Sequence, residues 1–168
     1  MAYTFWHCGV LIGESDLQDA PDNPRQLGGI FWPTAYGLQV FPRLSGMLTA
    51  AHALKAHMQS NGLSEDDMER PEVDEIFEKT QAGQKVIDIG RMLTDVEMRS
   101  PDGQRVEIAS IAFSDIMEMQ QLARDMQLDA ANVLAELPPD APRYIVSATV
   151  KHRAPAPSRD GKGHRFRH

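Results

Sequence analysis

Apolar and polar positions recur with different periods along this chain, and the periods predict its elements. Residues 3–12 are rich in aromatic and β-branched side chains and are split by Cys8 and Gly9. That pattern predicts one bent strand or a tight hairpin. Residues 13–29 contain three glycines and two prolines. This composition predicts a long loop, either functional or packed on itself.

Residues 30–41 have the composition of a strand, but Pro33 cannot donate a hydrogen bond to a sheet ladder. The strand is therefore expected at a sheet edge, or with its start delayed to about two residues beyond the proline. Residues 46–60 carry apolar side chains at spacings of three and four, which predicts a helix. Asn61-Gly62 supplies a left-handed stop for that helix.

Residues 64–80 are strongly acidic. Ser64 and Asp67 have the spacing of a capping box, although Asp stands where Glu or Gln is usual. Pro71 suits the first turn of a second helix, and acidic side chains near its start complement the helix dipole. The acidic stretch is interpreted as a solvated helix face, with docking of a basic segment as the alternative.

The strongest hairpin signal is Ser100-Pro101-Asp102-Gly103, which has the residue order of a type I turn. Apolar and polar residues alternate on both sides of it, so residues 84–99 and 104–113 are predicted to be its two arms. The first arm is long for a strand. Gly90 is therefore expected to mark either a bulge or the true start of that strand.

Ser114 is expected to cap a helix whose apolar face continues to Leu137, before Pro138-Pro139. Residues 143–150 alternate again and predict a last strand. From residue 30 onward the predicted order is βαββαβ with one additional helix. The predicted fold class is thus α+β, a ferredoxin-like plait with an antiparallel sheet and helices on one face. An N-terminal strand or hairpin precedes the plait.

At 168 residues and 42% hydrophobic content, the chain fits one domain, predicted to be 1–151, followed by a flexible tail, 152–168. The only cysteine is Cys8, which excludes an intramolecular disulfide and agrees with a reducing compartment. Neither a signal peptide nor an apolar run of membrane-spanning length is recognised. The expected location is the cytoplasm.

Charge divides the chain into two parts. Residues 151–168 hold six basic side chains and one acidic one, a net charge of +5. The remaining residues hold 11 basic and 23 acidic side chains, a net charge of −12. The basic segment is predicted to act as an interaction tail for nucleic acid or for an acidic protein surface. Its candidate residues are Arg153, Arg159, Lys162, Arg165, Phe166 and Arg167.

Motifs for nucleotide binding, acyl transfer and zinc binding are missing from the sequence, so no cofactor and no metal are predicted. His7 and Cys8 are adjacent and belong to ligand residue types. Neighbours on a strand point to opposite faces, so a structural role is favoured for this pair unless the chain bends at Gly9. His52 and His57 lie five residues apart on the predicted helix, too far around it to share one ion.

Aromatic side chains gather in the first quarter of the chain, beside the predicted loop at 13–29. Core packing is the favoured interpretation of these residues, but a pocket would also be built there. The candidate ligand-binding residues are His7, Glu14, Trp32, Tyr36 and Arg43.

The favoured functional hypothesis is a non-catalytic interaction or assembly module that self-associates or docks a protein partner, with no membrane association. A small-molecule-binding protein or cofactor-free enzyme, with a pocket near the N-terminal hairpin and residues 13–29, is the first alternative. Nucleic-acid binding through the basic tail is the second. Substrate, partner, pathway and oligomer number have no signature in the sequence.

Overall fold

The computed structural model describes residues 2–127 and 143–152. Strands and helices of the described parts occur in the following order along the chain: β1 (Tyr3–His7), β2 (Val10–Ser15), β3 (Gln18–Ala20), β4 (Asn23–Pro33), α1 (Ala35–Leu44), α2 (Met47–Ser60), a 3-10 turn (Glu65–Asp67), α3 (Pro71–Lys79), α4 (Gln81–Thr94), β5 (Val96–Arg99), β6 (Arg105–Val106), β7 (Ile108–Asp115), α5 (Ile116–Asp125) and β8 (Tyr144–Val150).

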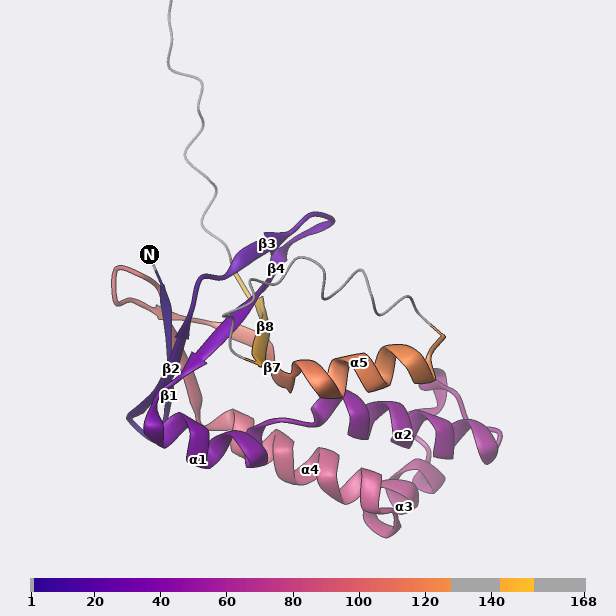
Figure 1. Cartoon of the computed structure of the whole chain (residues 1–168). Coiled ribbons are helices and arrows are strands. Elements are labelled where there is room, and N and C mark those ends of the chain that lie inside the picture. Colours follow the sequence, from indigo (N-terminus) through magenta and orange to yellow (C-terminus); the bar gives the residue numbers. More distant parts are fainter. Residues whose placement is uncertain (1, 128–142, 153–168) are drawn as a thin grey trace, which may run out of the picture.

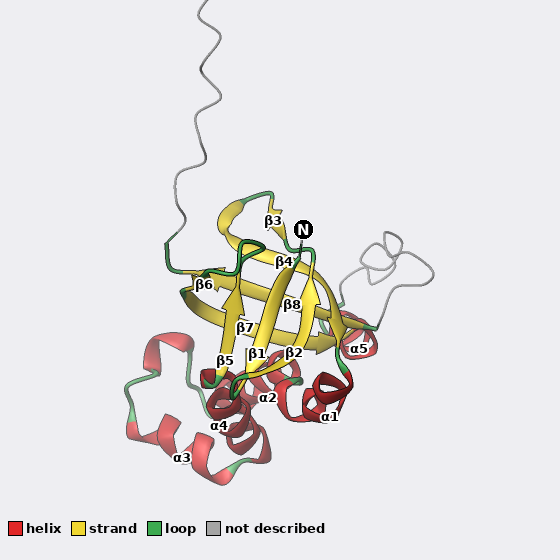
Figure 2. Cartoon of the chain, turned by 90° about the vertical axis from the view of Figure 1, so that its left-hand side faces the viewer, coloured by secondary structure: helices red, strands yellow, loops and turns green. Residues whose placement is uncertain are grey.

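The eight strands form a nearly barrel-shaped antiparallel sheet with the order β6-β5-β1-β2-β4-β8-β7, and β3 pairs with β4 (Figure 2). β4 serves both halves of the sheet, because its last residues pair with β2 and its earlier residues pair with β8. At the other end of the order, β6 and β7 are separated by Glu107 alone. The chain itself therefore joins the two ends of the sheet path.

Aromatic rings fill the interior of the barrel. Phe5, Phe31 and Phe113 are fully buried, and their centroids lie 5.0 to 5.8 Å apart in edge-to-face pairs. Phe41 of α1 stacks on Phe31 at 6.2 Å, and so brings the helix onto one end of the barrel. Edge-to-face contacts add to the free energy of burying large apolar surfaces. These rings are the centre of the main core.

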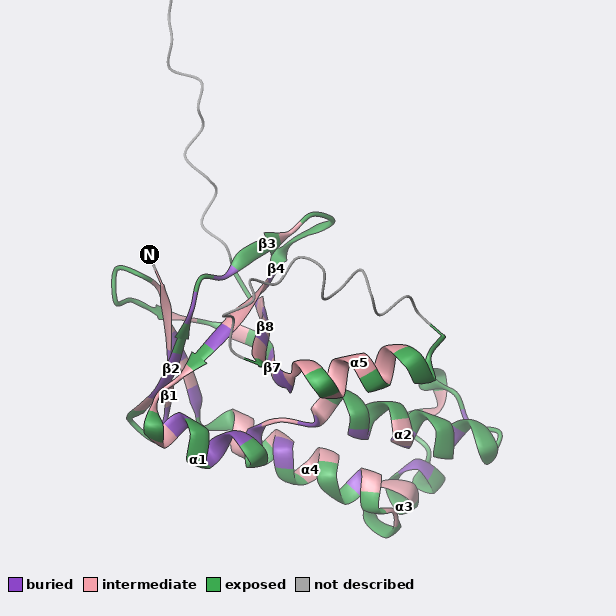
Figure 3. Ribbon diagram, viewed as in Figure 1, coloured by how far each residue is buried: buried purple, intermediate pink, exposed green. Residues whose placement is uncertain are grey.

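The helices α1 to α4 lie together at one end of the barrel, and α5 runs beside α2 (Figure 1). A smaller apolar cluster joins α2 and α3 through Met58, Leu63 and Val73, with Ile76 and Phe77 packed against it. The coloured ribbon shows that the outer faces of these helices are exposed (Figure 3). No helix in the described part of the chain is long and apolar enough to cross a membrane.

Several predicted elements are confirmed. Residues 3–12 form the hairpin of β1 and β2, and residues 143–150 correspond to β8. The helix predicted at 46–60 is α2, and Gly62 beyond it has a φ of +70°. Ser64 and Asp67 form the capping box, and α3 begins at Pro71. The Ser100–Gly103 turn also forms, because the Gly103 amide donates to the Ser100 carbonyl at 2.8 Å.

The loop predicted at 13–29 is wrong. These residues form the end of β2, all of β3 and most of β4. Gly29 stands within β4 because another strand approaches closely there: a Cβ atom at this position would lie 2.6 Å from Ser15 Oγ. The glycines that suggested a loop are thus explained in part by close packing of strands.

Two predicted strands are also corrected. Residues 35–44 form the helix α1, because the Thr34 side chain caps its start by accepting from the Gly37 amide at 3.0 Å. Residues 84–94 lie in α4, which Thr80 caps in the same way, and only Val96–Arg99 form a strand. With two helices in place of strands, the ferredoxin-like plait is not confirmed. The coarser α+β class is correct.

The remaining predictions concern the helix after Ser114 and the C-terminal part of the chain. α5 begins at Ile116 with Asp115 as its cap, one residue later than expected. Its predicted continuation to Leu137 and the basic tail from residue 153 lie outside the described residues. The division into a domain at 1–151 and a tail at 152–168 stays a prediction.

Candidate functional site

A groove of about 870 Å³ opens where β5 and β7 separate. β5 and β7 cross at a steep angle in Figure 2, and β6 leads from one to the other. The ends of α2 and α4 that face the barrel contribute Met47, Gly90, Leu93 and Thr94 to the groove wall. From β5 to β7 the lining residues are Val96, Glu97, Met98, Arg105, Val106, Glu107, Ile108, Ala109, Ser110 and Ile111, and Lys151 follows after β8.

The groove exposes an edge of the sheet. β7 pairs with β8 along one side. Along its other side, within residues 2–127 and 143–152, no strand pairs with β7 between Ile108 and Ala112, and a single bridge joins Ser45 to Phe113. Free backbone amides and carbonyls on a strand edge are a template for pairing with another extended chain. This edge borders the groove.

The interior and the rim of the groove differ in polarity. Val96, Met98 and Ile111 belong to the main core and form an apolar floor. Charged side chains stand in the wall and at the mouth, two acidic and two basic: Glu97, Glu107, Arg105 and Lys151. An apolar floor with a charged rim suits an amphipathic segment, with apolar side chains inward and charged side chains outward.

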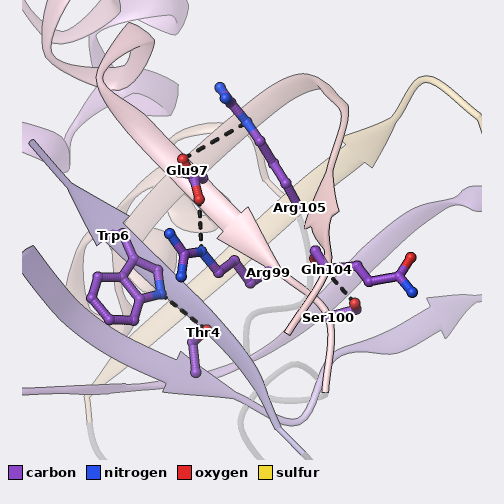
Figure 4. Close-up of polar contacts among 7 residues, drawn as sticks. All are labelled: Thr4, Trp6, Glu97, Arg99, Ser100, Gln104 and Arg105. Carbon is purple, nitrogen blue, oxygen red and sulfur yellow. Dashed lines mark hydrogen bonds and ion pairs between the residues drawn. The ribbon is translucent and has the colours of Figure 1, made fainter. Parts of the chain in front are cut away.

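A network of polar side chains organises the rim on the outer face of β1 and β5 (Figure 4). Arg99 Nε donates to Glu97 Oε1 at 2.7 Å, and Arg105 Nε lies 3.8 Å from the second carboxylate oxygen. The Arg99 guanidinium also lies over the ring of Trp6, 4.6 Å from its centroid. Trp6 in turn donates to Thr4 Oγ1 at 3.1 Å. Together these contacts hold Glu97 between two arginines beside the groove.

The hydrogen bond from Arg99 lowers the pKa of Glu97 below its ordinary value, and the charges of Arg99 and Arg105 add to that effect. We expect Arg99→Gln to raise the pKa of Glu97 toward its ordinary value, and Arg105→Gln to raise it less, because Arg105 is farther away. A ¹³C NMR titration of the Glu97 carboxyl carbon measures both. A larger rise in Arg105→Gln than in Arg99→Gln would contradict this arrangement.

The sign of the linked stability follows from the same shift. A carboxyl group whose pKa is lower in the folded state stabilises that state above its unfolded-state pKa. That contribution is lost as pH falls through the folded-state pKa. The Glu97 pairs therefore act at neutral pH and disappear in acid.

The five residues predicted as a ligand site do not converge. Glu14 and Trp32 are cross-strand partners on the exterior of β2 and β4, and both are exposed. His7 is buried in the opposite direction, at 6% exposure. Tyr36 packs against the main core from α1, whereas Arg43 on the same helix is exposed. None of the five lines the groove between β5 and β7.

The groove residues were missed because no motif marks them. Their only local signal is the alternation on either side of the Ser100–Gly103 turn, which identifies strands and not an open edge. A free edge depends on which strands pair, and pairing joins residues far apart in sequence. Comparisons of the chain with family models, with curated proteins and with solved structures found no match, so the geometry carries the functional argument.

Proposed function

We propose that this protein is a non-catalytic interaction module that binds an extended peptide by adding it as a strand to β7. The peptide that we propose is the basic C-terminal segment of a second copy of the chain. Self-association then occurs by exchange of these segments. The observation that carries the proposal is the unpaired edge of β7 beside a groove with an apolar floor.

Strand addition explains why an edge and a groove are useful together. In this mode of recognition, main-chain hydrogen bonds supply affinity and pockets for alternate side chains supply specificity. Between Ile108 and Ala112, the main-chain groups directed away from β8 have no strand partner among the described residues. Met98 and Ile111 lie in the floor beside them. A bound strand would thus find hydrogen-bond partners and an apolar surface at the same place.

The C-terminal segment has the properties of a suitable occupant. Lys151 lines the groove, so the segment leaves the described structure at the groove itself. Residues 158–168 contain no proline, which leaves all their amides available to a ladder. In an extended Arg165-Phe166-Arg167, the ring points to one side and both guanidinium groups to the other. Phe166 then fits the apolar floor.

Charge favours the association at longer range. Residues 151–168 carry +5 and the rest of the chain carries −12. The positively charged segment of one copy and the negatively charged remainder of another copy attract each other, and salt weakens this attraction. A chain shortened after His152 keeps the groove and lacks the proposed occupant. The two parts can therefore be tested separately.

Sedimentation equilibrium of the full chain tests the proposal. We expect an oligomer at low salt that weakens at high salt, and a monomer when residues 153–168 are removed. Phe166→Ala should weaken association at least about tenfold, because a buried aromatic anchor is worth more than about 1.4 kcal/mol. Ser158→Ala is the matched control in the same segment. A full chain that is monomeric at both salt concentrations contradicts the proposal.

A synthetic peptide of residues 153–168, added to the full-chain Phe166→Ala variant, locates the binding surface. Ser110 is exposed and lines the groove, so Ser110→Arg should block the peptide. Ser60→Arg, an exposed position at the end of α2, is the matched control. Equal binding of the peptide by these two variants would place its site elsewhere. Tight binding of a single-stranded oligonucleotide by the full chain, lost on truncation, would instead support the nucleic-acid alternative.

A further inference from the structure

Three potential ligand side chains meet where the β1–β2 hairpin turns beside the junction of α4 and β5. His7, Cys8 and Asp95 each offer one ligand atom, and these atoms all lie within 4.8 Å of one another. The Cys8 Sγ atom is 3.8 Å from His7 Nε2. Residues 7 and 95 are thus brought together by the pairing of β1 with β5, in which His7 is opposite Val96.

The turn explains how two consecutive residues reach one site. Cys8 and Gly9 have φ values of +48° and +78°, as in the two-residue type I′ turns of β-hairpins. Cys8 is therefore outside the strand, and the alternation that separates neighbouring side chains does not apply to it. The Cys8 amide donates to the Asp95 carbonyl at 3.3 Å, which attaches the turn to the end of α4. The bend that the sequence suggested at Gly9 thus begins one residue earlier, at Cys8.

His7 is a buried histidine with one ring nitrogen directed at the Cys8 thiol. Its side chain is 6% exposed, and its Nδ1 atom has no hydrogen-bond partner among the described residues. The polar contact of its other ring nitrogen in that part of the chain is the thiol of Cys8. Nε2 is therefore the nitrogen that can bind an ion beside the thiol, whereas Nδ1 lies on the other side of the ring and would not bind that ion.

The geometry and the donor types fit zinc. Bonds of about 2.3 Å to sulfur and about 2.1 Å to nitrogen at a tetrahedral centre separate these two atoms by roughly 3.6 Å. The observed 3.8 Å is close to that value. A thiolate and an imidazole favour zinc over magnesium or calcium, which prefer oxygen ligands. Cys8 and Asp95 are exposed, so an ion can enter from solvent.

We propose that His7, Cys8 and Asp95 bind one zinc ion, with the fourth coordination position open to solvent. The ion would join the β1–β2 turn to the junction of α4 and β5. Three protein ligands with one exchangeable position are the arrangement in which zinc accepts water or an external ligand. The proposal is independent of the groove, because none of the three residues lines it.

Titration of the metal-free full chain with Zn²⁺ and with Co²⁺ tests the site. We expect one ion per chain, visible bands of tetrahedral cobalt, and a thiolate-to-cobalt charge-transfer band in the near ultraviolet. Cys8→Ser should abolish the charge-transfer band. Asp95→Asn should weaken zinc binding at least about tenfold, since changes even in residues behind the ligands have effects of that size.

Matched controls separate this site from the other histidines and acids. The control variants are Asp88→Asn and His57→Gln. Asp88 is exposed on α4, and His57 is exposed on α2. Both should bind zinc and cobalt as the unchanged chain does. Cys8 and Asp95 are exposed, so their variants are expected to fold, which circular dichroism checks. Absence of stoichiometric binding, or equal zinc affinity in Cys8→Ser, Asp95→Asn and the unchanged chain, overturns the proposal.

Discussion

Replacing Phe113 by alanine is expected to destabilise the protein by about 3–5 kcal/mol. Phe113 is fully buried. The centroid of its ring lies 5.8 Å from that of Phe5, 5.0 Å from that of Phe31 and 6.4 Å from that of Phe41. The substitution leaves a cavity where three rings converge from two strands and a helix. A domain is typically stable by about 5–15 kcal/mol, so this one change removes a large part of the total.

Urea unfolding followed by tryptophan fluorescence measures the effect of Phe113→Ala. Phe113→Leu should cost less, about 1–1.5 kcal/mol, because it keeps most of the apolar volume. Leu38→Ala is the surface control, since Leu38 on α1 is 49% exposed and should change stability by less than about 1 kcal/mol. If Phe113→Ala costs no more than Leu38→Ala, the aromatic centre of the barrel is wrongly placed.

A second large effect is expected at Gly37, where α1 meets β2. A Cβ atom there would lie 1.8 Å from the Ile12 carbonyl oxygen and 2.8 Å from its carbon. Both are backbone atoms, and the same carbonyl accepts from the Thr34 amide at 2.9 Å. Neither helix nor strand can yield without losing contacts, so Gly37→Ala should destabilise the protein by about 3 kcal/mol or more.

The matched control for Gly37→Ala is Gly90→Ala. Gly90 also lies within a helix, α4, but nothing lies within 4 Å of its added Cβ. Alanine is favoured over glycine in a helix by about 0.5–1 kcal/mol, so Gly90→Ala should be slightly stabilising. Opposite signs for the same substitution in two helices would show that packing against Ile12 is responsible. Two stabilising substitutions would contradict the close approach of α1 to β2.

Much of the local structure could be predicted because its signals lie within a few residues. The Ser100–Gly103 turn depends on the conformational preferences of four consecutive residues. Likewise, the capping box at Ser64 needs only a hydroxyl and a carboxylate three residues apart. α2 and β8 follow from the spacing of their apolar side chains. These features hold in any tertiary context that keeps the segment intact.

The wrong predictions concern segments whose composition is compatible with both a strand and a helix. Residues 84–94 are rich in β-branched and apolar side chains, yet Val86, Ile89 and Leu93 also have helical spacing. The cap at Thr80, whose hydroxyl accepts from the Gly83 amide at 3.0 Å, and packing against α2 and α3 favour the helix. Local propensity is a weak preference, and tertiary contacts override it.

Neither candidate site could be predicted from the sequence. Strand pairing brings Asp95 to His7, although the two residues are 88 positions apart in the sequence. It also leaves β7 as the last strand of the sheet path, with one edge open to the groove. Neither arrangement has a motif, because both depend on which strands become neighbours and not on the strands themselves.

By itself, the sequence determined the α+β class, the two hairpins at residues 3–12 and around the Ser100–Gly103 turn, the helix at 46–60, and the separation of an acidic body from a basic C-terminal segment. Each depends on composition or on short-range periodicity. Only the tertiary structure decided that the strands close into a near-barrel around Phe5, Phe31 and Phe113, with a groove at β7. The physical reason is that sheet closure is set by long-range hydrogen bonds and side-chain packing, which the period of a single strand does not encode.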